Sequence, residues 1–543
     1  MKLIDISPND LTTVKNILDK YVPEYEIRAF GSRVTWTAKE SSDLDLVVMT
    51  DKPLATMRMA DLKEAFSESD LPFKVDVVDW AATKEGFKEI IEKQAVLLRD
   101  HISSEQNPLY APVFPSDWKP YSLYELAEWV NGMAFRNISF SNIGKPVIKI
   151  AEIKDGITGQ TKFTEEEYDK VYLLTEGDML FSWSGQPETS IDTFWYHGPA
   201  GWLNQHIFKV LPKNDCEYGF FYYLLKYLKP NFIRIASNKQ TTGLGHVTKK
   251  DLQNIKVRIP NKNLQRAIAH ILGALDDKIE LNRKMNQTLE EIARSIYKSW
   301  FVDFDPVKKK EAGEPTGLPE EIDKLFPSEF EESELGMIPK GWREVSASDL
   351  FQISPSVSLK KGELARCAEM SNLPTSGFLV TKTSTKPYNG GAKFLRNDVL
   401  LARITPCLEN GKTAIAHFLA PKEIGFGSTE FIVLRGKANV SYHFVYCLAR
   451  DANFRAHCIA SMVGSSGRQR VQNACFDNYR TAISATDLFL PFSKVVEPLF
   501  QDIITGGSEA EVLSNIRDTL LPLLLSGKLQ IKDAEKLLEK AGL

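Results

Sequence analysis

The sequence beyond residue 115 contains one unit written twice, and this repeat constrains the fold more than any single motif does. Trp118 and Trp342 open matching stretches that lie 224 residues apart, and LEEIARSI at Leu289 corresponds to LSNIRDTL at Leu513 with the same separation. Between these stretches, EGDMLFS corresponds to RNDVLLA and FKVL corresponds to FIVL, in the same order along the chain. We therefore expect two tandem globular domains, each followed by a helix.

A stripe of apolar residues follows the first copy and predicts a long helix. Its members recur at alternating steps of three and four, with Lys278 and Asn282 as a polar interruption. They are Leu264, Ile268, Ile271, Leu275, Met285, Leu289, Ile292 and Ile296. Such a stripe is typical of a helix packed on its own domain. The second copy ends in a related stripe, Leu513, Ile516, Leu520 and Leu523, which favours two helices that pair and act as a spacer.

Composition and motifs divide the chain into segments, and the expected fold class is a multidomain α/β (α+β) protein. The predicted segments are a compact α/β unit at 1–100, a linker at 101–117, the first copy at 118–261, a long helix at 262–301, an exposed linker rich in Pro and charge at 302–340, the second copy at 341–493, and a second helix with the C-terminal tail at 494–543.

The composition is that of a globular protein, with 43% hydrophobic and 25% charged residues in 543. The six cysteines form no CxxC pair, and no apolar run approaches the ~18 residues that suggest a membrane span. We therefore expect a soluble, cytoplasmic protein with free thiols. The net charge of -4 gives no sign of nucleic-acid binding, so local basic loops must contact DNA if DNA is bound.

Three acidic residues near the N-terminus lie on apolar, strand-like runs. Asp43 and Asp45 are two apart, so a strand directs them to the same face, and Asp76 lies on a second such run, KVDVVDW. Three carboxylates suit Mg²⁺, a hard cation that prefers oxygen ligands. Gly31 and Ser32, on the turn after YEIRAF, can supply a backbone amide and a hydroxyl to a nucleoside triphosphate. The group predicts a metal-dependent site for phosphoryl transfer.

This arrangement resembles the minimal nucleotidyltransferases of the polymerase-beta-like superfamily, whose pattern is Gly-Ser, a spacer, Asp-x-Asp and a later Asp. The resemblance covers about residues 5–100 and implies an NTP substrate with Mg²⁺. By position, it implies nucleotide binding by Gly31 and Ser32, and metal binding and catalysis by Asp43, Asp45 and Asp76. Asp79 is an alternative third acid, although its odd spacing from Asp76 directs it to the opposite face. The spacer VTWTAKE lacks the glycine that many members have there.

Each copy of the repeat carries a glycine-rich, basic loop at a corresponding place, SNKQTTGLGHVTKK in the first and SMVGSSGRQRVQN in the second. Glycine lets the backbone approach a phosphate, and Arg or Gln can form paired hydrogen bonds to base edges. A solvated surface loop is the alternative, and the matching positions make DNA contact an equally good interpretation. The predicted DNA-binding residues are Lys239, Thr241, Thr242, His246, Lys249, Arg468, Gln469 and Arg470.

The layout resembles the specificity subunit of type I restriction-modification systems over roughly residues 115–530. Five stretches carry the resemblance: GHVTKKDLQNIKVRIP, QRAIAHILGALDDKIELNRKMNQTLEEIARSIYKSWFVDFDPV, SELGMIPKGW, ARITPCLENGK and LLPLLLSGKL. The resemblance implies two target recognition domains that each read half of a split DNA site. It also implies that the two long helices pair antiparallel to fix the gap and dock methyltransferase subunits.

The resemblance thus predicts a non-catalytic specificity part within a restriction-modification complex, with a nucleotidyltransferase domain appended. Its implied partners are double-stranded DNA, methyltransferase subunits and restriction or translocase subunits, and S-adenosylmethionine and ATP are bound only by those partner subunits. One alternative is a nucleotidyltransferase that modifies a protein or RNA and is targeted to DNA by the repeat. Another is a DNA-binding protein without partner subunits. The apolar helix end with Trp300 and Phe301 favours a partner, because such a surface invites burial.

Overall fold

The computed structural model describes residues 4–6, 8–22, 25–35, 38, 42–69, 71–99, 112–135, 138–213, 215–239, 243–465, 467–484 and 488–540. The chain divides into two compact units, residues 1–272 with 520–543, and residues 273–519. In the described part of the chain, no helix is both long and apolar enough to cross a bilayer.

The N-terminal domain is a four-stranded sheet with helices on both faces. Its strands are β1 (Glu26–Phe30), β2 (Leu44–Met49), β3 (Val75–Asp79) and β4 (Val96–Arg99), in the order β3-β2-β1-β4. Its helices are α1 (Pro8–Tyr21), α2 (Thr56–Ser67) and α3 (Glu85–Gln94). Strands β2 and β3 are parallel, whereas β1 is antiparallel to β2 and β4. This arrangement confirms the predicted α/β unit.

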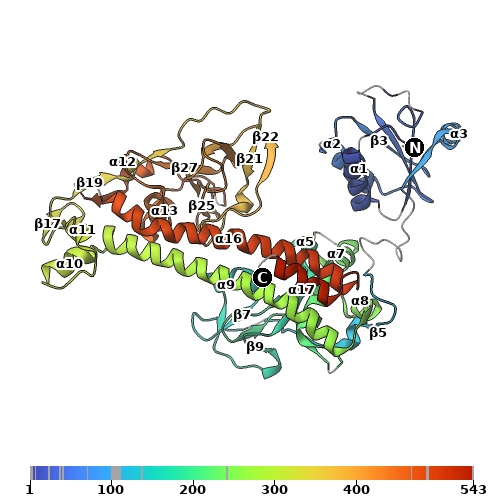
Figure 1. The fold of residues 1–543 in the computed structure, drawn as a ribbon, viewed down its shortest axis with the longest axis horizontal. Helices are drawn as coiled ribbons and strands as arrows, with labels where there is room; N and C mark the ends of the chain where they lie inside the picture. Colours follow the sequence, from blue (N-terminus) through green and yellow to red (C-terminus); the bar gives the residue numbers. More distant parts are fainter. Residues whose placement is uncertain are drawn as a thin grey trace. The chain divides into compact units, whose positions relative to one another are not determined.

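The two faces of this sheet follow from the alternation of side chains in LDLVVM. Leu44, Leu46 and Val48 pack with α1 and α2 in the main core. Val47 lies on the other face, where it packs with Ile91 of α3. Figure 1 shows α1 and α2 on one side of the sheet and α3 on the other. Because Asp45 is two residues before Val47, it belongs to the α3 face.

The two copies of the repeat have the same strand order in two four-stranded sheets, which confirms the predicted duplication. The first sheet of the first copy has the order β6 (Ala127–Asn131), β14 (Ile207–Pro212), β10 (Met179–Ser182) and β12 (Asp192–Trp195). The corresponding sheet of the second copy has the order β20 (Phe351–Ile353), β27 (Phe431–Gly436), β24 (Val399–Ala402) and β25 (Thr413–Ile415). The second sheet of the first copy has the order β8 (Phe163–Thr164), β7 (Lys145–Ile148), β13 (Gly201–Leu203) and β9 (Leu173–Leu174). The corresponding sheet of the second copy has the order β22 (Ser384–Pro387), β21 (Leu364–Ala368), β26 (Ile424–Gly427) and β23 (Ala392–Leu395).

Helices and strand pairs complete each copy in the same way. Strands β10 and β24 read MLFS and VLLA and are buried at every residue, as expected for central strands covered on both faces. The covering helices are α6 (Tyr218–Tyr227) and α7 (Lys229–Asn238) in the first copy, and α13 (Tyr442–Arg450) and α14 (Ala452–Ala460) in the second. The start and end of each copy pair as β5 (Lys119–Ser122) with β16 (Lys256–Ile259), and as β19 (Arg343–Ser346) with β28 (Arg480–Ile483).

The two long helices, α9 (Lys262–Phe301) and α16 (Phe489–Leu525), pair with each other, as the stripes predict, and the pairing is antiparallel, as the resemblance implies. Residue numbers rise along α9 as those of its partners on α16 fall, and Figure 1 shows α16 in red along α9 in green. The pairs are Asp276 with Arg517 at 2.6 Å, Asn282 with Glu509 at 2.9 Å, and Trp300 with Phe492 at 6.0 Å between ring centroids. The polar interruption therefore faces α16, where Asn282 and Lys278 both contact Glu509.

The predicted stripe is wrong at two positions of α9. Met285 and Ile292 are 50% and 43% exposed, whereas Ala293 and Tyr297 are buried. The reason is the period of the helix: 3.6 residues per turn, rather than 3.5, shifts the buried face by about 20° per seven residues. Leu289 and Ile296 remain against the core, and Met285 and Ile292 turn outward.

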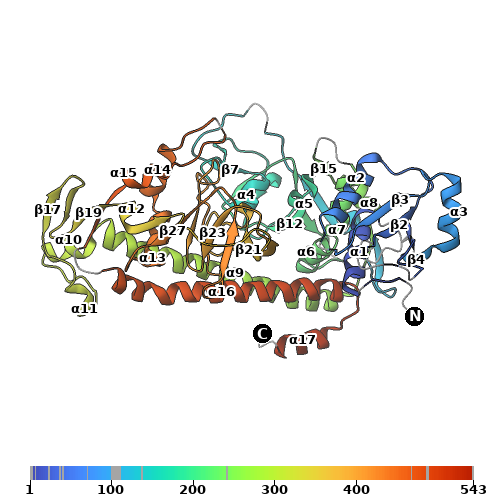
Figure 2. The same ribbon diagram turned by 90° about the horizontal axis from the view of Figure 1, so that it is seen from above.

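Much of the segment at 302–340 is exposed, as its Pro and charge content predict, but the segment contains regular secondary structure. It forms α10 (Asp305–Glu311), α11 (Glu320–Asp323) and the hairpin of β17 (Phe330–Ser333) with β18 (Gly336–Pro339), which Figure 2 shows gathered beside the C-terminal end of α9. The aromatic end of α9 is covered by its own chain: Trp300 and Phe301 are 3% and 2% exposed, and Trp300 packs on Phe326 with ring centroids 5.4 Å apart. Both residues are therefore unavailable to a partner. Sparse apolar residues such as Val307, Phe326 and Ile338 are enough to anchor this segment in the core.

Candidate functional site

Neighbouring strands bring two of the three predicted carboxylates side by side. Asp45 on β2 is paired in register with Asp76 on the parallel strand β3, and Asp43 comes just before β2. Burial, together with the charges of Asp76 and Asp43, raises the pKa of the Asp45 carboxyl. The acids therefore form a region of mutual repulsion, which a cation would relieve.

Gly31 lies directly against this acid pair. It follows β1, whose last residue, Phe30, is paired with Asp45. Its φ is +78°, and a Cβ placed there would be 2.2 Å from Asp45 Oδ2. The position therefore requires glycine for two reasons, the left-handed backbone and the close carboxylate. Among the described residues, no hydrogen bond joins the Ser32 hydroxyl to a partner, so this group is free to bind a ligand oxygen.

Arg33 is a residue of the site that the sequence analysis missed. Its guanidinium is buried and donates twice to the carbonyl of Ser42, at 2.8 and 3.0 Å, and once to that of Asp5 at 2.8 Å. It also lies 4.0 Å from the centroid of the Phe73 ring. Because Ser42 precedes Asp43, these bonds fix the backbone at the first carboxylate. The available signal was the position of Arg33 directly after Gly-Ser.

Two other charged residues, Lys74 and Asp79, lie near the three carboxylates, and their contacts show which of them belongs to the candidate site. Lys74 Nζ is 2.6 Å from Asp76 Oδ1, and this hydrogen bond and charge raise the pKa of the Lys74 ammonium. Asp79 is used by the fold: its carboxylate accepts from Thr50 Oγ1, from the Leu54 amide at 2.6 Å and from the Ala81 amide at 3.0 Å. The alternative third acid therefore holds together the chain segments that follow β2 and β3, and it is not free for a ligand.

The three carboxylates are neighbours but do not form a finished metal site. In the part of the chain that the structure describes, no three His, Cys, Asp or Glu side chains are gathered closely enough to hold a metal ion. The donor set nevertheless suits Mg²⁺, because it consists of carboxylates, and burial together with the charges of its neighbours raises the pKa of Asp45. The residues present fit such an ion chemically, and its ligand set stays a prediction.

Gly31→Ala tests the close approach of Gly31 to Asp45. We expect the domain to lose about 1–2 kcal/mol of stability because alanine is strained in the left-handed backbone. We also expect nucleotidyl transfer to fall strongly, because the new methyl group displaces the Asp45 carboxylate. Thermal unfolding and transfer of label from ATP measure the two effects. Gly86→Ala in α3 is the matched control, since nothing lies within 4 Å of its Cβ. Equal transfer activity in both variants would argue against the site.

The loop of the first copy has fewer free cations than the sequence suggests. Lys239 Nζ is 2.6 Å from both carboxylate oxygens of Asp251, and Lys249 Nζ lies 4.9 Å from the Tyr124 ring centroid. Burial would raise the pKa of Asp251, but the hydrogen bonds from Lys239 and Thr248 lower it. His246 lies on β15 (Gly245–His246), which pairs with β11 (Ser184–Gly185). Thr241 and Thr242 lie outside the described residues.

The two arginines in the loop of the second copy differ in their contacts. Arg470 donates to the Glu430 carboxylate from Nε at 2.9 and 3.0 Å and from Nη2 at 2.7 Å, so most of its donors are used within the protein. Arg468 is exposed, and within the described residues its side chain forms no hydrogen bond or ion pair. The Gln469 carbonyl accepts from the Thr405 amide at 3.0 Å, which fixes the loop backbone.

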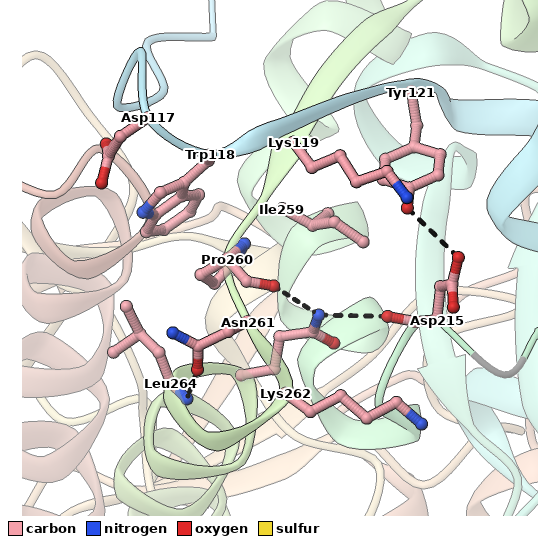
Figure 3. Close-up of a pocket in the computed structure, with 11 residues that line it drawn as sticks. Asp117, Trp118, Lys119, Tyr121, Asp215, Ile259, Pro260, Asn261, Lys262 and Leu264 are labelled. Atoms are coloured by element: carbon pink, nitrogen blue, oxygen red, sulfur yellow. Dashed lines mark hydrogen bonds between the residues drawn. The ribbon is translucent and has the colours of Figure 1, made fainter.

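A pocket of about 570 Å³ lies where α9 begins, between β5, β16 and the start of the helix. Several of its polar groups bond to each other. Tyr121 Oη donates to Asp215 Oδ2 at 3.2 Å (Figure 3), and the buried Gln265 amide donates to the carbonyls of Pro260 and Asp215 at 2.8 and 3.2 Å. These bonds join α9 to the first copy, and we interpret the pocket as a structural junction.

Comparisons with known proteins give separate matches for the N-terminal domain and for the part of the chain that follows it. Residues 12–102 match the family described as polymerase beta, nucleotidyltransferase, and residues 115–291 match the type I restriction modification DNA specificity domain. Over 473 residues the chain is 25% identical to the HindI specificity subunit of Haemophilus influenzae, covering 76% of this chain and 100% of that protein. The chain carries a polymerase-beta nucleotidyltransferase domain and a type I restriction modification DNA specificity domain.

Two further similarities concern the separate parts of the chain. Over 105 residues it is 48% identical to the probable protein adenylyltransferase MntA of Haemophilus influenzae, covering 19% of this chain and 92% of that protein. A crystal structure of the type I S subunit from M. genitalium is similar at 16% identity, with a TM-score of 0.40, over 75% of this chain and 96% of that one. The predicted resemblance to both families is confirmed.

Proposed function

We propose that this chain selects the DNA sequence for a type I restriction-modification complex by reading one half of a split site with each copy. The observation that carries the proposal is the duplicated fold, in which two copies with the same strand order are each followed by a long helix. Two similar reading modules fit two separate half-sites, and a fixed spacing between modules fixes the spacing between half-sites. The antiparallel pairing of α9 with α16 supports a spacer.

The test uses the full chain assembled with its methyltransferase subunit and S-adenosylmethionine. We expect methylation of adenine only in DNA that contains one split sequence with a fixed gap. Lengthening the gap by one base pair should remove methylation, since both copies then cannot engage at once. Methylation without sequence preference, or failure to assemble with a methyltransferase subunit, would refute the proposal.

The outward face of α9 supports the docking of a methyltransferase subunit. Leu281, Met285 and Ile292 are 51%, 50% and 43% exposed. They belong to a second series with alternating steps of four and three, consisting of Leu281, Met285, Thr288, Ile292, Ser295 and Ser299. A groove of about 470 Å³ runs along the later part of this series, from Thr288 to Ser299, with Leu318 as its other wall. This spacing suits a helix of a partner subunit, since it is the spacing of a coiled-coil seam.

The double substitution Met285→Glu and Ile292→Glu tests this face. We expect the affinity for the methyltransferase subunit to fall at least about 10-fold, because two charges would be buried against an apolar partner. Isothermal titration of the purified subunits measures the affinity. Gln287→Glu, exposed on the same helix, is the control and should change it little. An unchanged affinity in the double variant would exclude this face as the docking surface.

We further propose that the N-terminal domain transfers an adenylyl group from ATP to a hydroxyl group of a protein. The 48% identity to a probable protein adenylyltransferase supports this choice of nucleotide and acceptor. The acceptor oxygen bonds to the α-phosphorus, the bond between the α-phosphorus and the bridging oxygen breaks, and pyrophosphate leaves. Asp43, Asp45 and Asp76 would hold Mg²⁺, which neutralises phosphate charge when bound.

The residues of the domain have separate tasks in this proposal. The Gly31 amide and the Ser32 hydroxyl donate to phosphate oxygens, and the turn they form requires glycine because a Cβ at position 31 would lie 2.2 Å from Asp45 Oδ2. The Asp76 carboxylate accepts a hydrogen bond from the acceptor hydroxyl and receives its proton. Arg33 holds Asp43 in place through the carbonyl of Ser42.

A further inference from the structure

The two copies hold their basic loops in the same backbone frame. In the first copy, the Val247 amide donates to the Trp183 carbonyl at 2.9 Å, and Ser184 pairs with His246. In the second copy, the Val471 amide donates to the Arg403 carbonyl at 2.9 Å, and Ile404 pairs with Arg470. Val247 and Val471 are both fully buried. The separation from each residue of the first loop to its counterpart is 224, the separation of the repeat itself.

The turn before this frame is also the same in both copies. Gly243 and Gly467 occupy matching positions with φ of +84° and +80°. One residue later, the first copy has Leu244 and the second has Arg468. Leu244 is 58% exposed although it is apolar. Arg468 is exposed, and its side chain has no partner among the described residues, whereas its carbonyl accepts a hydrogen bond from Arg470 Nη1 at 3.3 Å. The frame therefore presents two chemically different side chains at one position.

Leu244 and Arg468 are the tip residues of the two loops. The residues behind these tips differ between the copies, and the difference indicates a separate role for Arg470. In the second copy, the Arg403 amide donates to the Glu430 carbonyl at 3.0 Å, and the Glu430 side chain holds Arg470 with three bonds. In the first copy the matching residues are His206 and His246, and no ion pair joins them in the described structure. The Arg470–Glu430 pair thus fixes the loop of the second copy, whereas the first copy has the same frame without it.

We propose that Leu244 and Arg468 are matched base-reading positions, and that Arg470 is a positioning residue that holds Arg468 in place. This inference rests on the proposed reading of DNA by the two copies. Arg468 can donate twice to the O6 and N7 acceptors of a guanine in the major groove. Leu244 has no donor and suits the C5-methyl group of a thymine. The two half-sites then differ at one corresponding position because the tip residues differ.

A reciprocal exchange tests the inference with the full chain and its methyltransferase subunit. A DNA library with both half-sites randomised is selected by binding, and the enriched sequences are read. We expect Arg468→Leu to lower the preference for guanine at one position of one half-site by roughly 10- to 100-fold. We expect Leu244→Arg to create a preference for guanine at the corresponding position of the other half-site.

Charge reversal separates positioning by Arg470 from direct contact. Arg470→Glu alone should remove base discrimination at the same half-site as Arg468→Leu does, because the introduced carboxylate and that of Glu430 then repel each other. Arg470→Glu combined with Glu430→Arg should restore most of it, since the ion pair is rebuilt in the opposite sense. A double variant as defective as the single one would show that Arg470 itself contacts DNA and would overturn its assignment as a positioning residue.

The outcomes distinguish the inference from the proposed function. If the wild-type complex enriches no split sequence, the proposed function fails. If it enriches one, and the two tip variants leave both half-sites unchanged or weaken both equally, the tip assignment is overturned. Because both tips are exposed, neither exchange removes core packing.

Discussion

Replacing Asp43 and Asp45 by asparagine should reduce label transfer from ATP by roughly 10²- to 10³-fold, because two of the three carboxylates lose their charge. The assay incubates the full chain with labelled ATP, Mg²⁺ and cell extract. Asparagine keeps the shape of both side chains, so the sheet pairing of Asp45 with Asp76 should be retained. The substitution also removes a half-buried charge and its repulsion by Asp76, so the fold should not weaken.

Asp51→Asn is the matched control for this experiment, since Asp51 is an exposed carboxylate just beyond the other end of β2. It should transfer label at the wild-type rate. Transfer that survives in the double variant would contradict this site. Sequence-specific methylation by the same double variant should be unchanged, because the carboxylates belong to a separate domain.

Arg450→Met should cost the second copy about 3–5 kcal/mol of stability, because it removes one partner of a buried charge network. Arg450 is 7% exposed and donates to the carbonyls of Thr375 and Gly411 at 2.8 and 2.7 Å, to that of Gly377, and to Tyr446 Oη at 3.0 Å. Tyr446 in turn donates to Glu290 on α9. Without the guanidinium, the Glu290 carboxylate stays buried without its cation.

Hydrogen exchange measured by mass spectrometry localises this loss. Amides of α13 in the second copy should exchange faster in the variant, whereas those of α6 in the first copy serve as an internal control and should not change. Arg468→Met makes the same chemical change at an exposed position and should leave both helices protected. Equal exchange in α13 of the wild type and Arg450→Met would show that the network adds little stability.

Periodic and repeated features of the fold were predictable from the sequence. The strand LDLVVM, the helix at α9 and the duplication all depend on spacing along the chain, which the sequence contains directly. The regular structure of the segment at 302–340 was not predicted, because a few apolar residues among many charged ones decide its packing. Composition averages over the whole segment and conceals such residues.

The acids of the candidate site were also identified from spacing, but their surroundings were not. Arg33 bonds to Ser42 nine residues away, and Asp79 bonds to Thr50 across two strands. Such contacts depend on how loops return to the sheet. The same limit applies to the DNA-binding predictions: Arg468 and Arg470 look equivalent in the sequence, and only the contact of Arg470 with Glu430 separates them.

The sequence by itself determined that this chain carries a nucleotidyltransferase-type acid pattern and two copies of a DNA specificity unit with paired helices, because each of these is a property of residue order. The tertiary structure decided which side chains remain free to act. It pairs Lys239 with Asp251 and Arg470 with Glu430, buries Trp300, and leaves Met285 and Leu244 exposed. A charge or an apolar side chain can bind a partner only if folding has not already matched it within the protein, and residues distant in sequence decide that match.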